Sequence, residues 1–125
     1  MIRVELSPNG MFNIPEFGTV KDPEQFKALY AYSPYHRVQD GTAYPAILFM
    51  TGANDPRVDP MQSRKMTARL QKAKSSDYPV LLRTSSKTGH GGGTPLSDKI
   101  EEYTDQYSFL FHFLGVEYSE VNSNP

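Results

Sequence analysis

The sequence has no cysteine and no long apolar run, and each of these absences excludes a class of protein. Without cysteine, disulfides and thiolate metal sites are excluded. No apolar stretch approaches the roughly 18 residues that a membrane-spanning helix needs, so we expect no membrane partner. The N-terminus "MIRVELSPNG" lacks the apolar segment of a signal peptide, and we therefore expect a cytoplasmic location.

The charges show no excess of one sign. There are 13 basic and 14 acidic residues, and the basic ones do not cluster. This argues against a nucleic-acid partner, which calls for a basic patch. The histidines do not have a metal-ligand spacing such as His-x-x-x-His, so we expect no metal and no cofactor. A chain of 125 residues suits one domain with a real core.

Three stretches have the pattern of helices, each with an acid or hydroxyl followed by proline at its start. They are residues 22–32, 59–74 and 94–115. In the first two, Asp22 and Asp59 are N-cap candidates, and each is followed three residues later by glutamine, a capping-box pattern. The third keeps apolar residues at helical spacing up to Gly115, a residue type that commonly ends helices.

Two runs have the pattern of strands. Residues 45–51 are continuously apolar, which is typical of a strand covered on both faces in a parallel sheet, and residues 78–86 form a second run. With the helix between them they predict a βαβ unit. The first 40 residues are loop-rich and show no strand. Two strands are too few for a free-standing α/β domain, so the sequence predicts part of a larger sheet.

The first of these strands also predicts self-association. No proline or lysine interrupts Ala46–Met50, so nothing blunts a free edge of this strand. An exposed apolar edge presents unpaired N–H and C=O groups that another chain can pair with. We therefore expect a homo-oligomer, a dimer or a higher closed form, joined through this edge or by exchange of the N-terminal 40 residues.

Polar segments follow both strands at their carboxyl ends, where open parallel sheets bind ligands. They read "TGANDPRVDP" and "SSKTGHGGG", with Asp55 four residues past the first strand and His90 four past the second. Because neighbouring strands lie about 5 Å apart, we expect the Asp55 carboxylate near Nδ1 of His90, in the loose geometry common in unliganded sites. Such a carboxylate orients a histidine that acts as a base. The order acid, then histidine, is that of an α/β-hydrolase.

Other interpretations of these residues stay open. Asp55 suits an Asx-turn after a strand, and His90 could merely flank a glycine turn. The "HGGG" motif forms an oxyanion hole in lipases, but there it precedes the nucleophile in the chain. A phosphate-binding loop would need a Gly-Lys-Ser/Thr ending, which is missing. We expect structural roles for His36 and His112.

"TGANDPRVDP" followed by "KTGHGGG" resembles the C-terminal end of the catalytic domain of the prolyl oligopeptidase family of serine peptidases. The segments "EFGTVKDPEQFKALYAYSPYHRV" and "KIEEYTDQYSFLFHFLGV" are similar to the family as well, so the resemblance covers about residues 1–117 and leaves 118–125 as a tail. It implies a partial α/β-hydrolase fold, with Asp55 as triad acid and His90 as triad base. Arg57 matches an arginine that binds a backbone carbonyl of the peptide in the family's prolyl endopeptidases.

The nucleophile of that family is missing from the sequence, because no Gly-x-Ser-x-Gly occurs. The resemblance implies that the serine and the oxyanion-hole residues precede Met1 in a longer protein. We therefore expect peptide-bond hydrolysis through an acyl-enzyme in the parent enzyme and no activity in this chain alone. Two alternatives remain: an association module of the same half-fold, and a small hydrolase with an unrecognised nucleophile.

Overall fold

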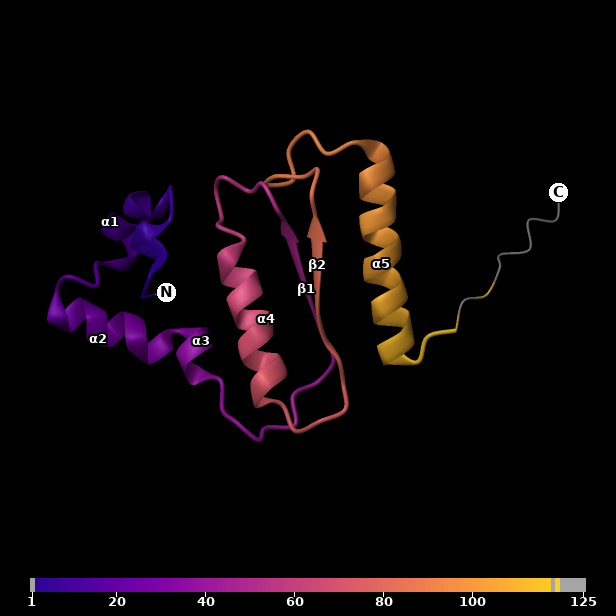
Figure 1. Cartoon of the computed structure of the whole chain (residues 1–125), viewed down its shortest axis with the longest axis horizontal. Helices are drawn as coiled ribbons and strands as arrows, with labels where there is room; N and C mark the ends of the chain where they lie inside the picture. The colour runs from indigo at the N-terminus through magenta and orange to yellow at the C-terminus, as the bar shows by residue number, and fades with distance from the viewer. Residues whose placement is uncertain (1, 118, 120–125) are drawn as a thin grey trace. The chain divides into compact units, whose positions relative to one another are not determined.

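A computed structural model describes residues 2–117 and residue 119 (Figure 1). The predicted tail, residues 118–125, lies outside the described residues except for Ser119. The chain divides into two compact units, Met1–Gly93 and Thr94–Pro125. Within the described ranges, every helix is too short or too polar to cross a lipid bilayer.

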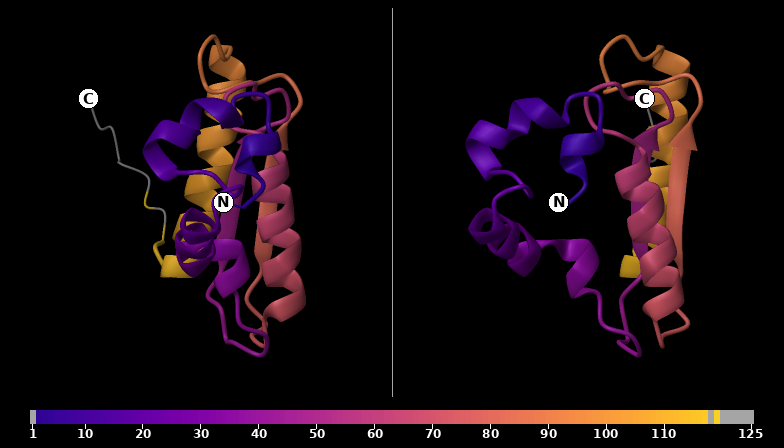
Figure 2. Two further views of the ribbon diagram at one scale, coloured as in Figure 1. Left: turned by 90° about the vertical axis from the view of Figure 1, so that its left-hand side faces the viewer. Right: turned by 60° about the vertical axis from the view of Figure 1, so that its left-hand side comes forward.

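The centre of the first unit is the predicted βαβ unit. Strands β1 (Ile47–Gly52) and β2 (Val80–Ser85) pair in parallel, from Ile47 opposite Val80 to Gly52 opposite Ser85. Helix α4 (Met61–Ala73) connects them and runs alongside both strands (Figures 1 and 2). This confirms the two predicted strands, their parallel direction and the intervening helix.

The core of this unit is small. Four buried residues from the helix, β2 and the segment before β1 form it, and partly buried apolar side chains pack around them. The buried four are Val38, Leu70, Ala73 and Val80. All six residues of β1 are only partly buried, and among the described residues no strand pairs with its second edge.

Polar side chains fix α4 against its surroundings. The Asp59 carboxylate accepts from the N–H of Met61 at 2.8 Å. The helix begins at Met61 with Pro60 as its N-cap, one residue later than the predicted Asp59 cap implies. The Arg69 guanidinium donates to the Val38 carbonyl at 2.8 Å. The Gln71 side-chain amide donates to the Val80 carbonyl at 2.8 Å and so ties the helix to the start of β2.

The N-terminal segment is made of short helices and contains no strand among its described residues, as predicted. The elements are the 3₁₀ helices η1 (Val4–Leu6) and η2 (Gly10–Asn13) and the α-helices α1 (Ile14–Phe17), α2 (Pro23–Tyr32) and α3 (Pro34–Arg37). Helix α2 and its Asp22 cap, which accepts from the N–H groups of Glu24 and Gln25, are confirmed. The capping box is only half formed, because the Gln25 side chain accepts from the N–H of Thr19 instead.

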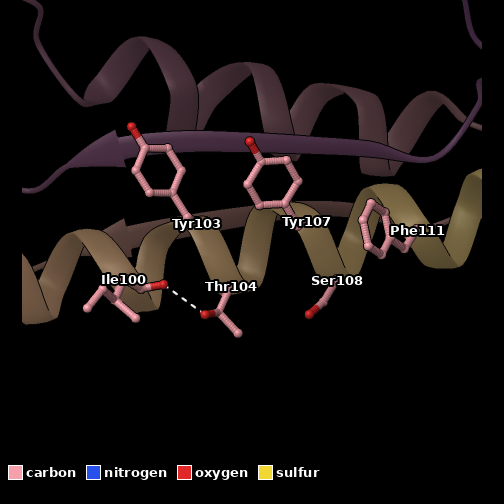
Figure 3. A pocket seen from close by; sticks show the side chains of 6 residues that line it. All are labelled: Ile100, Tyr103, Thr104, Tyr107, Ser108 and Phe111. Atoms are coloured by element: carbon pink, nitrogen blue, oxygen red, sulfur yellow. Dashed lines mark hydrogen bonds between the residues drawn. The ribbon is translucent and has the colours of Figure 1, made fainter. Parts of the chain in front are cut away.

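The second unit consists mainly of helix α5 (Leu96–Leu114), which ends as predicted at Gly115 in the left-handed conformation with φ 66°. Figure 3 shows one of its faces, where the rings of Tyr103, Tyr107 and Phe111 follow one another along the helix. Successive ring centroids lie 6.2 and 6.1 Å apart. This face is a shallow groove along a single helix.

Candidate active site

The parallel pairing of β1 and β2 brings the loops that follow them to the same end of the sheet, at the carboxyl ends of the strands (Figure 1). The N–H of Ala53 donates to the Ser85 carbonyl at 2.8 Å and extends the ladder one step beyond β1. From there the first loop carries Asp55 and the second carries His90. Their placement follows from strand pairing inside the first unit.

Asp55 and His90 are hydrogen-bonded. Oδ2 of Asp55 lies 2.8 Å from Nδ1 of His90, the ordinary length of a charge-assisted hydrogen bond. The expectation of a loose contact is therefore wrong, and the expectation of proximity is confirmed. A carboxylate can only accept, so a neutral His90 donates its Nδ1–H and keeps the Nε2 lone pair. Among the described residues, nothing is bonded to Nε2. The Asp55 side chain is 10% exposed and that of His90 43%.

The second carboxylate oxygen of Asp55 organises its own loop. Oδ1 accepts from the N–H groups of Arg57 and Val58, each at 2.8 Å. Asp55 thus forms the Asx-turn with Oδ1 and the histidine contact with Oδ2, so both interpretations of this residue hold. Burial acts to raise the pKa of Asp55. The hydrogen bonds from the N–H of Val58, from His90 and from the N–H of Arg57 outweigh it and lower that pKa below its usual value. Asp55 is therefore a carboxylate at neutral pH.

Close backbone approach between the loops depends on Gly52, which the sequence analysis missed. A Cβ on Gly52 would lie 2.4 Å from the Gly89 carbonyl oxygen and 2.5 Å from that of Thr88. Only glycine fits there. The signal was available, since an isolated glycine at the end of a strand often marks such an approach. Thr88 is buried, and its close approach to Gly52 fixes the start of the loop that carries His90.

Arg57 lies on the same loop as Asp55 and is exposed. Its backbone N–H is used in the turn, while its guanidinium has no hydrogen-bond or ion-pair partner among the described residues. The structure thus brings Asp55 and His90 together and places Arg57 two positions from the acid. Contact of Arg57 with a peptide stays a prediction.

A serine–histidine contact also occurs outside the two loops that follow β1 and β2. Oγ of Ser33 lies 2.9 Å from Nδ1 of His36. Ser33 is fully buried and precedes α3, so its hydroxyl cannot reach a substrate. The His36 ring packs against Tyr30 and Tyr35, with centroids 5.0 and 5.2 Å away. These contacts fit the predicted structural role of His36 and offer no alternative nucleophile.

Metal binding has no structural support in the part of the chain described. There, no three His, Cys, Asp or Glu side chains gather closely enough to hold a metal ion. His112, on α5, packs edge-on against Phe113 with ring centroids 4.7 Å apart.

A sequence model of the prolyl oligopeptidase family matches residues 6–117. Prolyl oligopeptidase A of Amanita bisporigera is 32% identical over 112 residues, which are 89% of this chain and 15% of that protein. The prolyl endopeptidase of Elizabethkingia meningoseptica is 36% identical over 103 residues, 82% of this chain and 15% of the relative. The chain thus spans about 15% of the length of these curated relatives.

Solved structures agree with the sequence matches. A chain from a structural and mechanistic analysis of two prolyl endopeptidases superposes with a TM-score of 0.89 at 45% identity, over 94% of this chain and 17% of the other. Prolyl oligopeptidase B from Galerina marginata, bound to a 35mer hydrolysis and macrocyclization substrate, superposes with a TM-score of 0.87 at 31% identity. The match covers 96% of this chain and 17% of the other. The fold is therefore α/β and corresponds to part of an α/β-hydrolase catalytic domain.

Proposed function

The chain belongs to the prolyl oligopeptidase family of serine peptidases, and from this premise we propose that it supplies the acid and the base of a catalytic triad. In this proposal His90 is the base and Asp55 the acid that orients it. The observation that carries the proposal is the 2.8 Å contact between Oδ2 of Asp55 and Nδ1 of His90 at the carboxyl ends of two parallel strands. The reaction of the complete enzyme would be peptide-bond hydrolysis.

The proposed mechanism follows from the two ring nitrogens of His90. Nε2 removes the proton from a serine hydroxyl as the serine oxygen attacks the peptide carbonyl carbon. The imidazolium that forms is stabilised by the Asp55 carboxylate at Nδ1 and then donates its Nε2 proton to the leaving amine. In the second step, Nε2 of His90 removes a proton from water as the water attacks the acyl-enzyme, and the proton then returns to the serine oxygen. The lowered pKa of Asp55 keeps it ionised throughout.

The serine is proposed to come from the remainder of the catalytic domain. The 125 residues contain no Gly-x-Ser-x-Gly, and the chain spans about 15% of its curated relatives. The acid and base alone cannot form an acyl-enzyme, so we infer that the isolated chain is inactive. We further infer that residues 1–117 are the C-terminal portion of the catalytic domain.

Arg57 is proposed to bind the peptide. Its guanidinium is exposed and has no partner among the described residues, and the Asx-turn of Asp55 fixes its backbone. A guanidinium donates several hydrogen bonds and suits a backbone carbonyl of an extended substrate. The Galerina marginata relative, solved with a 35mer substrate, supports a peptide as the substrate class.

A chimera tests the proposal. These residues would replace the matching segment of the Elizabethkingia meningoseptica prolyl endopeptidase, which supplies the rest of the catalytic domain. We expect hydrolysis of a fluorogenic prolyl peptide by the chimera, and loss of it in Asp55→Ala. Arg57→Ala should lower kcat/KM by about 10- to 100-fold, as expected when one hydrogen bond to a charged group is lost.

The second candidate is an association module, which the free edge of β1 favours. Among the described residues, β2 is the only strand paired with β1, and all six β1 residues are partly buried. We propose that the isolated chain forms a homo-oligomer by pairing this edge with that of a second copy. This proposal is compatible with the first, because the same edge would be covered inside a complete catalytic domain.

A further inference from the structure

Two successive side chains of the loop after β1 reach across to the loop that carries His90. The side-chain amide of Asn54 donates to the Ser86 carbonyl at 2.7 Å, and Asp55 contacts His90 at 2.8 Å. Between these contacts, the backbone N–H of Asn54 donates to the Thr88 carbonyl at 3.4 Å. The His90 loop is thus tied at residues 86, 88 and 90 by two neighbouring residues.

We propose that Asn54 is a positioning residue, which sets the Asp55–His90 contact by holding the Ser86 carbonyl. This rests on the proposed function of the pair. The paired strands end at Gly52 and Ser85, and the N–H of Ala53 uses the Ser85 carbonyl. The Ser86 carbonyl is the next one along the chain, and there the Asn54 side chain replaces a strand partner.

The His90 loop needs such a tie because its glycine-rich backbone has many accessible conformations. Residues 89–93 contain four glycines, and Gly91 and Gly93 have φ of 88° and 72°. Glycine loses more conformational freedom on ordering than any other residue. The His90 side chain is 43% exposed, so packing contributes little to holding it. Without the Asn54–Ser86 bond, the Asp55–His90 hydrogen bond would have to offset a larger share of the entropy lost when this loop is ordered.

The chemistry of asparagine suits this position. Its amide donates without carrying a charge, so it leaves the field around Asp55 unchanged. A carboxylate at position 54 would repel Asp55, and a lysine there would compete with His90 for it. A neutral donor one residue before the acid therefore ties the two loops and leaves Oδ2 of Asp55 for His90.

The test is NMR of the 125-residue chain with ¹⁵N-labelled histidine. It measures the exchange of the His90 Nδ1 proton with water and the ¹⁵N shifts that report its tautomer. Asn54→Ala should speed this exchange about fivefold, as expected for the loss of one hydrogen bond. Gln71→Ala is the matched control, because Gln71 makes the same amide-to-carbonyl bond at 2.8 Å with Val80, at the far end of β2. It should leave the exchange within about twofold.

A second variant covers the case in which Asn54→Ala does not fold. Asn54→Ser keeps a turn-forming polar side chain, but it is too short to reach the Ser86 carbonyl and should act like Ala. Unchanged exchange in both variants, an equal effect of Gln71→Ala, or unfolding of both variants would each overturn the positioning role. Asp55→Asn separates this failure from that of the proposed function. If it too leaves the Nδ1 proton unchanged, the pair itself is not formed.

Discussion

Oδ2 of Asp55 and Nδ1 of His90 lie 2.8 Å apart although 35 positions separate the two residues in the sequence. The contact exists because parallel strands β1 and β2 end together, and because Gly52 lets the two loops approach. It is formed within one compact unit of the chain. The proposed acid–base pair is thus built by a single βαβ unit.

The isolated chain should not hydrolyse a fluorogenic prolyl peptide. It lacks a serine at Nε2 of His90 in its described part, and a triad without its nucleophile retains only residual catalysis. The measurement is turnover by the purified 125-residue chain. The contrary result is turnover of about 10 per second, the median for enzymes, that disappears in His90→Ala. It would show that the chain has its own nucleophile.

Replacing Gly52 by alanine should disrupt the candidate site. The added Cβ would lie 2.4 Å from the Gly89 carbonyl oxygen, which should cost about 1–3 kcal/mol in the free energy of unfolding. Urea unfolding measures this. Gly92→Ala is the control, since a Cβ there meets nothing within 4 Å, and it should change the free energy by less than about 1 kcal/mol. Equal effects of both variants would contradict the close approach of the loops.

The lowered pKa of Asp55 predicts how stability changes with pH. Because the folded state holds this pKa below its unfolded value of about 3.9, Asp55 contributes stability above the unfolded value. That contribution is lost as the pH falls through the folded pKa. The unaltered chain should therefore lose more stability than Asp55→Asn between neutral pH and about pH 3.

Urea unfolding across this range checks the pH prediction. Asp77→Asn is the control, because Asp77 is exposed and its carboxylate has no hydrogen bond or ion pair among the described residues. It should leave the pH dependence of the unaltered chain unchanged. If Asp55→Asn follows the same curve as Asp77→Asn, the hydrogen bonds to Asp55 do not stabilise the fold.

Light scattering at micromolar concentration tests the association through β1. We expect a dimer or a higher closed oligomer, because the second edge of β1 has no partner among the described residues. A folded monomer with strongly protected amides along Ile47–Gly52 would contradict this. It would mean that another segment of the same chain covers the edge.

The sequence predicted those features that depend on local pattern. Apolar runs located β1 and β2, the Asp22 cap located the start of α2, and Asp59 lay two residues before the start of α4. The ends of the two strands, together with the family resemblance, pointed to Asp55 and His90. The tie from Asn54 to Ser86 was not predictable, because it depends on where two loops leave a paired sheet. The Gln25 contact also escaped prediction, because its side chain accepts from the N–H of Thr19, six residues earlier, and so the capping box is only half formed.

The assignment of His90 as the base is tested in the chimera with the Elizabethkingia meningoseptica prolyl endopeptidase. The measurement compares the kcat/KM of its His90→Ala and His112→Ala variants. His112 is a histidine of α5, in the other compact unit. We expect His90→Ala to lower kcat/KM by at least about 10⁴-fold, as loss of a triad base does. His112→Ala should keep it within about threefold. A His90→Ala chimera with activity close to that of the unaltered chimera would contradict the assignment of His90 as the base.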